Sequence, residues 1–502
     1  MISGQDVQRI ISEVEPFFNP KTIAVVGASL KKNNPGHIIF HNLIENAKKG
    51  ILKAKVYGVN VKGGELYGNK LYRSLSEIPD NIEHVIVAVR AQFVPDVLEE
   101  SGRKGVKVAT IISGGFSEVG NVELENRVLK IGKEHGIRII GPNGLGIYDA
   151  YSGIDTLFIP TYKETGEGPK LNMPRPKPGV ITFLSQSGAL GDAVLDYMWG
   201  EGIGISKFVS WGNKIDVGEK ELLLYLMEDE TTKVVMMYIE SIKEAGHEII
   251  EIGKEFSKRK PIVVLKGGIT EAGIRATYSH TASLAGNIKI YEAALKSMGA
   301  VLSWNIQEFV DMAKALALQI PAKGNKIGIV TNGGGPGIVL ADLAEKYGLK
   351  VPSLSKETIS KLNNYVKEGV IPNIATFSNP IDISGTGTDE SYAAATKCLM
   401  EDPNIDLVIV LALHHPPALT KELPKKIIQV IKDNSKPVIV MDMGSTEMSD
   451  WVRKQFEDKK IPTYPLPWRA VVAAKALVEY GKWLLRNNVY EDYVKNRCAG
   501  FE

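Results

Sequence analysis

Residues 22–43 read TIAVVGASLKKNNPGHIIFHNL: a short β-branched run ends at a glycine, and a helix-like segment follows. The same order returns in VITFLSQSGALGDAV at residues 180–194 and in KIGIVTNGGGPGIVLADLAEKYGL at residues 326–349. Continuous apolar strands that alternate with amphipathic segments are typical of a parallel sheet covered by helices on both faces. The sequence therefore predicts an α/β protein in which such an opening begins each of three domains.

The alternation of strands and helices stops in a stretch rich in Gly, Pro and charge, KETGEGPKLNMPRPKPG at residues 163–179. Proline resists both helix and sheet, so a domain boundary is expected there. A length of 502 residues suits about three domains. The expected divisions are a first domain at residues 1–150, a linker at 151–178, a second domain at 179–320, a third at 324–485 and a charged tail at 486–502.

Composition excludes several classes of partner. Lys and Arg total 60 and Asp and Glu total 58, so a formal charge of +2 predicts no binding to nucleic acid or membrane. Cys398 and Cys498 are too few for a disulfide framework or a thiolate metal site, and no metal ligands are expected. The acidic, polar start of the chain is unlike an export signal, which together with the cysteine usage predicts a cytoplasmic protein.

The turn around Gly27 and Ser29, after the first predicted strand, is a candidate ligand site. Ligands of open parallel sheets bind beyond the carboxyl ends of the strands, and N–H groups at a helix start favour phosphate. The turn lacks GxGxxG spacing and a closing acidic residue, which disfavours NAD. Lys62 and Arg90 follow later strands and could neutralise phosphates or be solvated surface charges. A tight turn without a ligand remains the alternative.

Two further helix starts are candidate phosphate sites. Ser185, Ser187 and Gly188 stand between a strand and a helix, where the helix dipole and free amides favour an anion. A plain N-cap serine is the alternative. The glycine-rich turn NGGGPG at residues 332–337 lets the backbone approach an anion closely, but it lacks the GK[ST] ending of a P-loop. A packed strand–helix corner is the alternative there.

His280 is a candidate nucleophile among eight histidines, most of which should be structural. Small and hydroxyl residues flank it, and the preceding strand and glycine pair, VVLKGG, predict an exposed loop at the same edge as Ser185 and Ser187. Glu240 ends another apolar strand and could hold the Nδ1–H of an imidazole, which would leave Nε2 free to react. A strand-terminal salt bridge is the alternative role for this carboxylate.

Taken in order, these motifs resemble those of one family. The matching strings are VVGAS, GVNVKGG, ISGGFSE, GPNGLG, SQSGAL, SWGNKID, YIES, SHTASLAG, NGGGPG and NPIDISG. In this order they are similar to the alpha subunits of ADP-forming acetate and other acyl-CoA synthetases, within the succinyl-CoA synthetase superfamily. The resemblance runs from residue 22 to about 390 and continues more weakly toward the end of the chain.

The resemblance implies a CoA-binding Rossmann domain followed by two flavodoxin-like, doubly wound parallel-sheet domains. It implies catalytic roles for His280, the phosphorylated histidine, and for Glu240, which orients and stabilises it. The implied CoA contacts are Gly27, Ser29, Lys62, Ser113, Gly114 and Asn143. The implied phosphate-holding helix starts are Ser185, Ser187 and Gly188, and Gly333, Gly334 and Gly335.

The implied activity is that of an acid–thiol ligase which interconverts acyl-CoA, ADP and phosphate with carboxylic acid, CoA and ATP. No ATP-grasp domain is recognisable in these residues, so ATP, ADP and Mg²⁺ are expected mainly on a separate ATP-grasp beta subunit, in an α2β2 heterotetramer. Two other functions stay open: a regulatory protein that binds CoA or acyl-CoA, and a nucleotide-independent acyl or carbamoyl transferase on the same fold.

Overall fold

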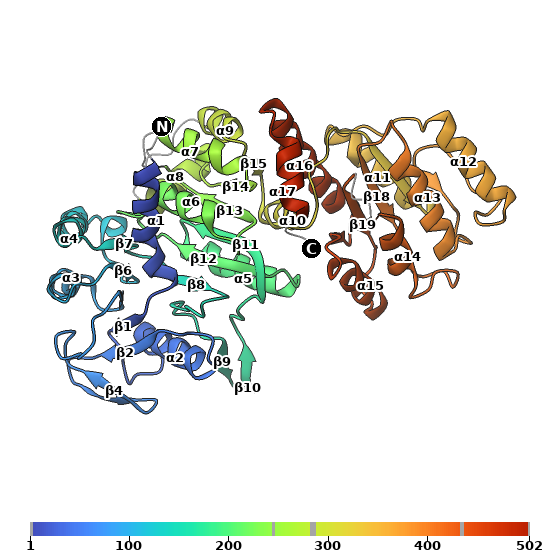
Figure 1. The fold of residues 1–502 in the computed structure, drawn as a ribbon. Coiled ribbons are helices and arrows are strands. Elements are labelled where there is room, and N and C mark those ends of the chain that lie inside the picture. The colour runs from blue at the N-terminus through green and yellow to red at the C-terminus, as the bar shows by residue number, and fades with distance from the viewer. Residues whose placement is uncertain (1–3, 243–245, 282–287, 432–435, 500–502) are drawn as a thin grey trace. The chain divides into compact units, whose positions relative to one another are not determined.

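The computed structural model describes residues 4–242, 246–281, 288–431 and 436–499, with side chains left out at 277–281 and 498–499. The chain divides into two compact units, residues 1–302 and 303–502. The first unit contains two large sheets and the second unit contains one (Figure 1).

The first sheet of the first unit has the strand order β3-β4-β2-β1-β5-β6-β7. Its strands are β1 (Thr22–Val26), β2 (Lys55–Val59), β3 (Gly64–Leu66), β4 (Asn69–Tyr72), β5 (His84–Val87), β6 (Val108–Ile111) and β7 (Arg138–Ile140). All pairings are parallel except that of β3 with β4. Strands β1 and β5 are buried along their whole length, as the continuous apolar runs predict.

The second sheet has the order β15-β14-β13-β11-β12-β8. Its strands are β8 (Ile147–Asp149), β11 (Pro178–Ser185), β12 (Ile205–Ser210), β13 (Val234–Ile239), β14 (Ile262–Lys266) and β15 (Val301–Ser303). Without β8, which pairs antiparallel with β12, the order is the 2-1-3-4-5 of flavodoxin-like sheets. Residues 151–178, expected as a linker, include an antiparallel hairpin of β9 (Tyr162–Thr165) and β10 (Gly168–Leu171).

Helices flank both sheets of the first unit. They are α1 (Gly4–Phe18), α2 (Pro35–Lys48), η1 (Ala91–Phe93), α3 (Val94–Arg103), η2 (Ser117–Val119), α4 (Val122–His135), α5 (Gly188–Gly200), α6 (Glu219–Glu228), α7 (Gly246–Ser257), α8 (Glu271–Thr281) and α9 (Ile288–Ser297). Helix α1 lies beside α6, far along the chain (Figure 1), and Phe18 stacks on Tyr225 with ring centroids 5.1 Å apart. One hydrophobic core includes Val25 of the first sheet and Val235 of the second, so the two sheets are packed into one unit.

The second unit repeats the flavodoxin-like order, as β17-β16-β18-β19-β20. Its strands are β16 (Ile327–Thr331), β17 (Ile381–Asp382), β18 (Leu407–Leu411), β19 (Val438–Met441) and β20 (Thr463–Tyr464). Its helices are α10 (Ile306–Leu318), α11 (Gly334–Lys346), α12 (Lys356–Lys367), α13 (Asp389–Glu401), α14 (Leu423–Val430), α15 (Glu447–Glu457), α16 (Pro467–Arg486) and α17 (Tyr490–Ala499). In the charged tail, Tyr490 is buried and donates to the carbonyl of Pro321 at 2.6 Å.

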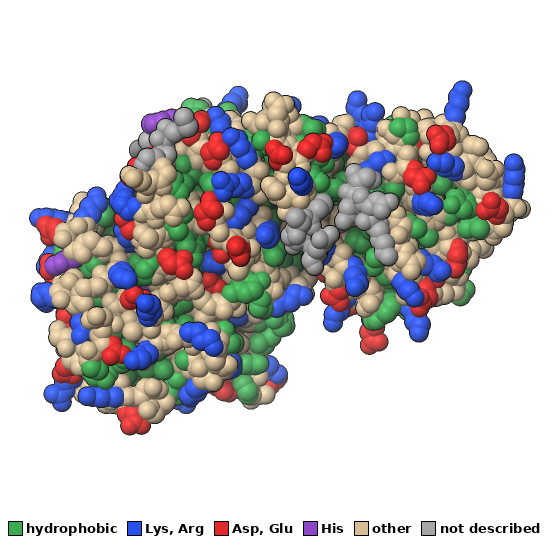
Figure 2. Space-filling model, in the orientation of Figure 1, with side chains coloured by type: hydrophobic (Ala, Val, Ile, Leu, Met, Phe, Trp, Pro, Cys, Tyr) green, Lys and Arg blue, Asp and Glu red, His purple; other side chains and the backbone are tan. Residues whose placement is uncertain are grey.

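The predicted α/β class is confirmed, with a Rossmann-type sheet and two flavodoxin-type sheets. On the face drawn in Figure 2, basic and acidic side chains are interspersed over both units, in keeping with the near-zero net charge. In the described ranges, no helix combines the length and the apolar character needed to cross a membrane.

Candidate functional site

The residues predicted to contact CoA lie at the carboxyl edge of the first sheet. Lys62 follows β2, Gly27 and Ser29 follow β1, Ser113 and Gly114 follow β6, and Asn143 follows β7. Strands β2, β1, β5, β6 and β7 are neighbours in one parallel sheet, so their carboxyl ends form a continuous edge. At about 4.8 Å between strands, this edge is roughly 19 Å long, which suits an extended ligand rather than a compact one.

Side chains that sequence reasoning missed fix the loops at the β1–β2 end of this edge. Asn60 donates to the carbonyl of Ala28 at 2.8 Å and accepts from the Lys62 N–H at 3.0 Å, so it ties the two loops together. His37 donates through Nδ1 to the Ser29 carbonyl at 2.7 Å, and its Nε2 accepts from Tyr67 at 2.7 Å. The Lys62 side chain is exposed and able to meet an anion.

The loops after β5, β6 and β7 are also closely packed, both against one another and against the Gly27 turn. Ser113 donates to the carbonyl of Val89 at 2.5 Å. A Cβ at Gly114 would lie 3.0 Å from Asn143 Oδ1, so glycine lets the β6 and β7 loops meet. Gly27 has φ +102°, and a Cβ there would lie 2.3 Å from the Ala88 carbonyl, so only glycine suits this turn. These closely packed turns, with exposed Lys62 and Arg90 available for phosphates, are chemically suited to CoA.

The Ser185–Gly188 turn opens α5 at the carboxyl edge of the second sheet. Ser187 is the N-cap, and its hydroxyl accepts from the Leu190 N–H at 3.3 Å. Ser185 is fully buried and donates to the carbonyl of Ser187 at 2.6 Å, which stabilises the turn. The plain N-cap role of Ser187 is therefore real, and the remaining amides of the first turn stay available to an anion.

Gln186, between the two serines, joins this turn to the end of β13. Its Oε1 accepts from the Glu240 N–H at 2.8 Å and from the Ser241 N–H at 3.1 Å. Glu240 is buried, and Lys266 at the end of β14 donates to its carbonyl at 2.7 Å. Burial lowers the pKa of Lys266 to about 8, although the Glu240 carboxylate opposes the shift. Gln186 thus brings the predicted carboxylate beside the predicted phosphate turn.

His280 lies in α8, so the loop expected around it is wrong. No proline interrupts residues 271–281, and the Thr270 hydroxyl, which accepts from the Gly273 N–H at 3.1 Å, caps the start of a helix. The side chain of His280 lies outside the described residues, as do residues 282–287. Cα atoms of α8 come within 8 Å of η2, which belongs to the loop after β6.

Asn213, in the loop after β12, bridges the edges of the two sheets. It accepts from Asn143 Nδ2 at 3.2 Å and donates to Glu118 Oε2 at 2.6 Å and Glu125 Oε2 at 2.7 Å. Burial would raise the pKa of Glu118, but hydrogen bonds from Asn213 and from three backbone amides outweigh it and lower that pKa. Two residues before Asn213, the N–H of Trp211 donates to the carbonyl of Ser185 at 2.9 Å. The predicted CoA loops and the predicted phosphate turn therefore belong to one hydrogen-bonded region.

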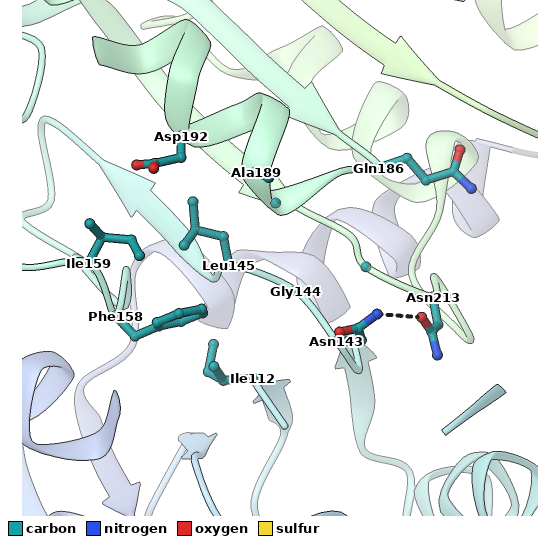
Figure 3. A pocket seen from close by; sticks show the side chains of 12 residues that line it. Ile112, Asn143, Gly144, Leu145, Phe158, Ile159, Gln186, Ala189, Asp192 and Asn213 are labelled. Carbon is teal, nitrogen blue, oxygen red and sulfur yellow. Dashed lines mark hydrogen bonds between the residues drawn. The ribbon is translucent and has the colours of Figure 1, made fainter. Parts of the chain in front are cut away.

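A pocket of about 360 Å³ opens in this region, within the first unit. Its lining residues are Ile112, Asn143, Gly144, Leu145, Phe158, Ile159, Gln186, Gly188, Ala189, Asp192, Gly212 and Asn213. Figure 3 shows the amides of Asn143, Gln186 and Asn213 at one end and apolar side chains with Asp192 at the other. A volume of this size suits a small ligand.

In the second unit, Gly333, Gly334 and Gly335 stand at the start of α11. Gly333 is the N-cap, and no side chain caps the helix. Asn332 holds the turn to the neighbouring strand end, because its Nδ2 donates to the Leu413 carbonyl and its Oδ1 accepts from the Leu413 N–H, both at 3.0 Å. The amides of this helix start are suited to an anion in the same way as those of α5.

Gln186, Asn213, Lys266 and Asp192 were not predicted as site residues. Gln186 lies inside the SQSGAL string and Asn213 inside SWGNKID, so position within a motif was an available signal for these two. Asp192 lies in the helical part of VITFLSQSGALGDAV and Lys266 in VVLKGG, but nothing in these strings indicates that either side chain belongs to the site.

Three family models match successive parts of the chain. They are a CoA binding domain at residues 21–150, a succinyl-CoA ligase like flavodoxin domain at 178–316 and a ligase-CoA domain at 327–484. These ranges coincide with the Rossmann-type sheet and the two flavodoxin-type sheets in chain order.

Curated relatives and solved structures are similar over nearly the whole chain. The alpha subunit of acetate–CoA ligase (ADP-forming) I from Pyrococcus furiosus is 36% identical over 94% of this chain and 98% of its own length. The alpha subunit of isoenzyme II from the same organism is 38% identical over 93% and 97%. A dinucleotide-forming acetyl-coenzyme A synthetase 1 from Ca. Korarchaeum cryptofilum, in complex with phosphate and ADP, is 34% identical, with a TM-score of 0.83 over 94% and 98%.

Proposed function

The chain belongs to the family of alpha subunits of ADP-forming acetate–CoA ligases, and from this premise we propose that it carries the phosphoryl group of the reaction on His280. It is the alpha subunit of an ADP-forming acyl-CoA synthetase, an acid–thiol ligase with a CoA-binding domain. An alpha subunit implies a beta partner, and we assign ADP, ATP and Mg²⁺ mainly to an ATP-grasp beta subunit of an α2β2 assembly.

The reaction divides into three transfers. Phosphate attacks the thioester carbonyl, and the C–S bond breaks to give an acyl phosphate and the thiol of CoA. His280 Nε2 then attacks the phosphorus, and the acid leaves as its carboxylate. ADP finally takes the phosphoryl group from Nε2 and becomes ATP. Each step is reversible, and each depends on positioning and on charge stabilisation more than on covalent chemistry by the protein.

CoA is assigned to the edge of the first sheet, through Gly27, Ser29, Lys62, Ser113, Gly114 and Asn143. Phosphate is assigned to two helix starts, that of α5 with Ser185, Ser187 and Gly188 and that of α11 with Gly333, Gly334 and Gly335. Backbone amides at a helix start donate to an anion without needing to reorganise, which makes them suited to a phosphoryl group in transit.

Glu240 is assigned to the histidine. A carboxylate that accepts from Nδ1–H holds the imidazole in the tautomer whose Nε2 is nucleophilic, and it stabilises the cationic phosphoimidazole. The observation that carries the proposal is the pair of hydrogen bonds from the backbone amides of Glu240 and Ser241 to Gln186, because they fix the backbone of the residue that bears the carboxylate to the phosphate turn. The Asn143–Asn213 bond extends this region to the CoA loops.

The test is phosphorylation of the chain mixed with its beta subunit and labelled ATP. We expect acid-labile, base-stable phosphate on the wild-type chain and none on His280→Ala. His247→Ala, at an exposed histidine of the same unit, is the matched control and should label normally. Glu240→Gln should bind CoA but lose most labelling.

Equal labelling of His280→Ala and the wild-type chain would show that another residue carries the phosphate. A wild-type chain that binds CoA but never labels, even with its partner, would instead favour the regulatory function.

A further inference from the structure

The pocket between the two sheet edges has two chemically different ends (Figure 3). At one end, Gln186 belongs to the phosphate turn and Asn143 to the CoA loops. At the other end, Phe158 and Ile159 form an apolar wall beside the carboxylate of Asp192. Leu145 lies against Gly188, since a Cβ on Gly188 would be 3.3 Å from Leu145 Cβ. A wholly apolar end would suit a hydrocarbon chain, whereas the Asp192 carboxylate indicates a ligand with a polar group at that end.

The apolar wall is rigidly supported. Arg175 forms a nearly buried ion pair with Asp155, with its Nε 2.8 Å from Oδ2, and the exposed fractions of the two side chains are 12% and 7%. The same guanidinium donates to the carbonyl of Ile159 at 3.1 Å and to that of Met173 at 2.9 Å. The segment with Phe158 and Ile159 is therefore held in place by a network and forms a constant surface for a ligand.

Asp192 makes none of the hydrogen bonds of the Arg175 network. It lies one helical turn beyond Gly188 on α5, and its Oδ1 is buried with no hydrogen-bond partner in the described part of the chain. The cation that most affects it, Arg175, is already engaged by Asp155 and two carbonyls. Burial raises the pKa of Asp192, and Asp196 on the next turn adds to the shift. The Asp192 side chain is half-buried, and a ligand group that pairs with its buried Oδ1 gains affinity because an unpaired buried oxygen is destabilising.

We propose that Asp192 selects carboxylic acids that carry a hydroxyl group at the end away from the carboxylate. This inference rests on the proposed function, because it places the reacting carboxyl beside the start of α5 at Gly188 and the rest of the acyl chain along α5 toward Asp192. A hydroxyl can donate to a carboxylate or accept from a carboxylic acid, so it satisfies Asp192 in either state. An ammonium group needs the ionised form of Asp192, which burial and the neighbouring Asp196 disfavour because they raise the pKa of this carboxyl.

The length of the acid follows from the helix. Four residues from Gly188 to Asp192 correspond to about 6 Å along α5. With carbon–carbon bonds of about 1.5 Å, an acid of about four carbons with a terminal hydroxyl covers this distance, whereas acetate does not.

The test compares acids that differ only at the far end. Steady-state kcat/KM is measured with the complete alpha–beta enzyme for 4-hydroxybutyrate, butyrate and 4-aminobutyrate. We expect the wild-type enzyme to prefer the hydroxy acid over butyrate about tenfold or more, because butyrate leaves Asp192 unpaired. Asp192→Leu should reverse the preference, and the isosteric Asp192→Asn, which can still donate and accept, should retain part of it.

Asp196→Asn, one turn further along α5 and outside the pocket lining, is the matched control and should keep the wild-type ratio. A ratio unchanged in Asp192→Leu would overturn the proposal, and so would a wild-type preference for butyrate or 4-aminobutyrate. Labelling of His280 in the same wild-type preparation distinguishes a failure of this inference from a failure of the proposed function. Normal labelling with no hydroxy-acid preference overturns this inference alone, whereas no labelling overturns the proposed function.

Discussion

The starts of α5 in the first unit and α11 in the second are the same local structure made from different residues. Each helix follows the strand that is numbered 1 in the 2-1-3-4-5 order of its sheet. In each, a hydroxyl at the end of that strand donates to a carbonyl two residues later: Ser185 to Ser187 at 2.6 Å and Thr331 to Gly333 at 3.1 Å. The next residue, Gln186 or Asn332, holds the backbone of the neighbouring strand end. The same hydrogen-bonded turn therefore connects strand and helix at the equivalent position of both flavodoxin-type sheets.

The difference between the two starts lies in the cap. Ser187 engages the Leu190 amide at 3.3 Å, while Gly333 has no side chain to offer. The neighbours differ too, because Gln186 reaches a buried glutamate and Asn332 reaches Leu413. A shared backbone geometry can therefore serve two chemical purposes, and the side chains at two or three positions decide which. The comparison suggests that α11 leaves more amides free for an anion than α5 does.

A negative charge at the start of α11 should have the largest effect on labelling. Gly335→Asp should leave the fold intact, because a Cβ there meets nothing within 4 Å and a carboxylate is favourable at a helix N-terminus. It should slow labelling of His280 by about a hundredfold, since the carboxylate competes for the amides assigned to phosphate. Rapid-quench labelling with the beta subunit gives the rate.

Gly335→Asn is the matched control, because asparagine has the shape of aspartate but no charge. Its labelling rate should fall far less than that of Gly335→Asp. Labelling of Gly335→Asp at the wild-type rate would mean that the start of α11 holds no phosphate during the reaction.

The second test removes the two anchors. Gln186→Leu and Asn332→Leu should each lower the free energy of unfolding of their own unit by about 2 kcal/mol, because each leaves backbone groups unpaired inside the protein. Only Gln186→Leu should also slow labelling, since Gln186 is the anchor that holds the strand end with Glu240. Urea unfolding and labelling of the same preparations report the two effects.

Asn363→Leu, at an exposed amide of α12, serves as the control and should change stability by less than about 0.5 kcal/mol. If Asn332→Leu slowed labelling as much as Gln186→Leu, the two anchors would not differ in function.

The smallest expected effect concerns the caps themselves. Ser187→Ala should destabilise α5 by about 1 kcal/mol. Gly333→Ser should stabilise α11 by at most about 0.3 kcal/mol, because its Cβ would lie 2.9 Å from Leu413 Cδ1 and the leucine side chain has to move. Hydrogen exchange of first-turn amides measures both. Ser355→Ala at the capped start of α12 is the control: it should lose as much stability as Ser187→Ala without any change in labelling. An unchanged exchange rate at Leu190 in Ser187→Ala would contradict the assigned cap.

Much of the fold was predictable from local pattern. The strands β1, β11 and β16 occur where apolar runs end at Gly27, Ser185 and near Asn332, and each is followed by a helix. Such runs report burial on both faces, which is a property of the residues themselves. The loop expected around His280 was wrong because the strand and glycine pair VVLKGG were taken to begin a loop that reaches His280, whereas that loop ends at Thr270, whose hydroxyl caps the helix.

The site was predictable only in its outline. The residues at strand ends, such as Glu240 and Asn143, could be placed at a sheet edge from their position in the sequence. Their partners could not, because Gln186 meets Glu240 across 54 residues and Asn213 meets Asn143 across 70. No periodicity encodes such pairs, and the same holds for Asp192, whose isolation depends on Arg175 being engaged elsewhere.

Local sequence is enough to specify the α/β class, the three strand–turn–helix openings and the residues at their ends, because periodicity, glycine and capping chemistry act over a few neighbouring residues. Packing of the sheets was needed to bring two sheet edges of the first unit together, to connect them through Gln186 and Asn213, and to leave a pocket with one unpaired carboxylate between them. Hydrogen bonds and burial between distant segments form only when the sheets pack, so no pattern of neighbouring residues encodes them.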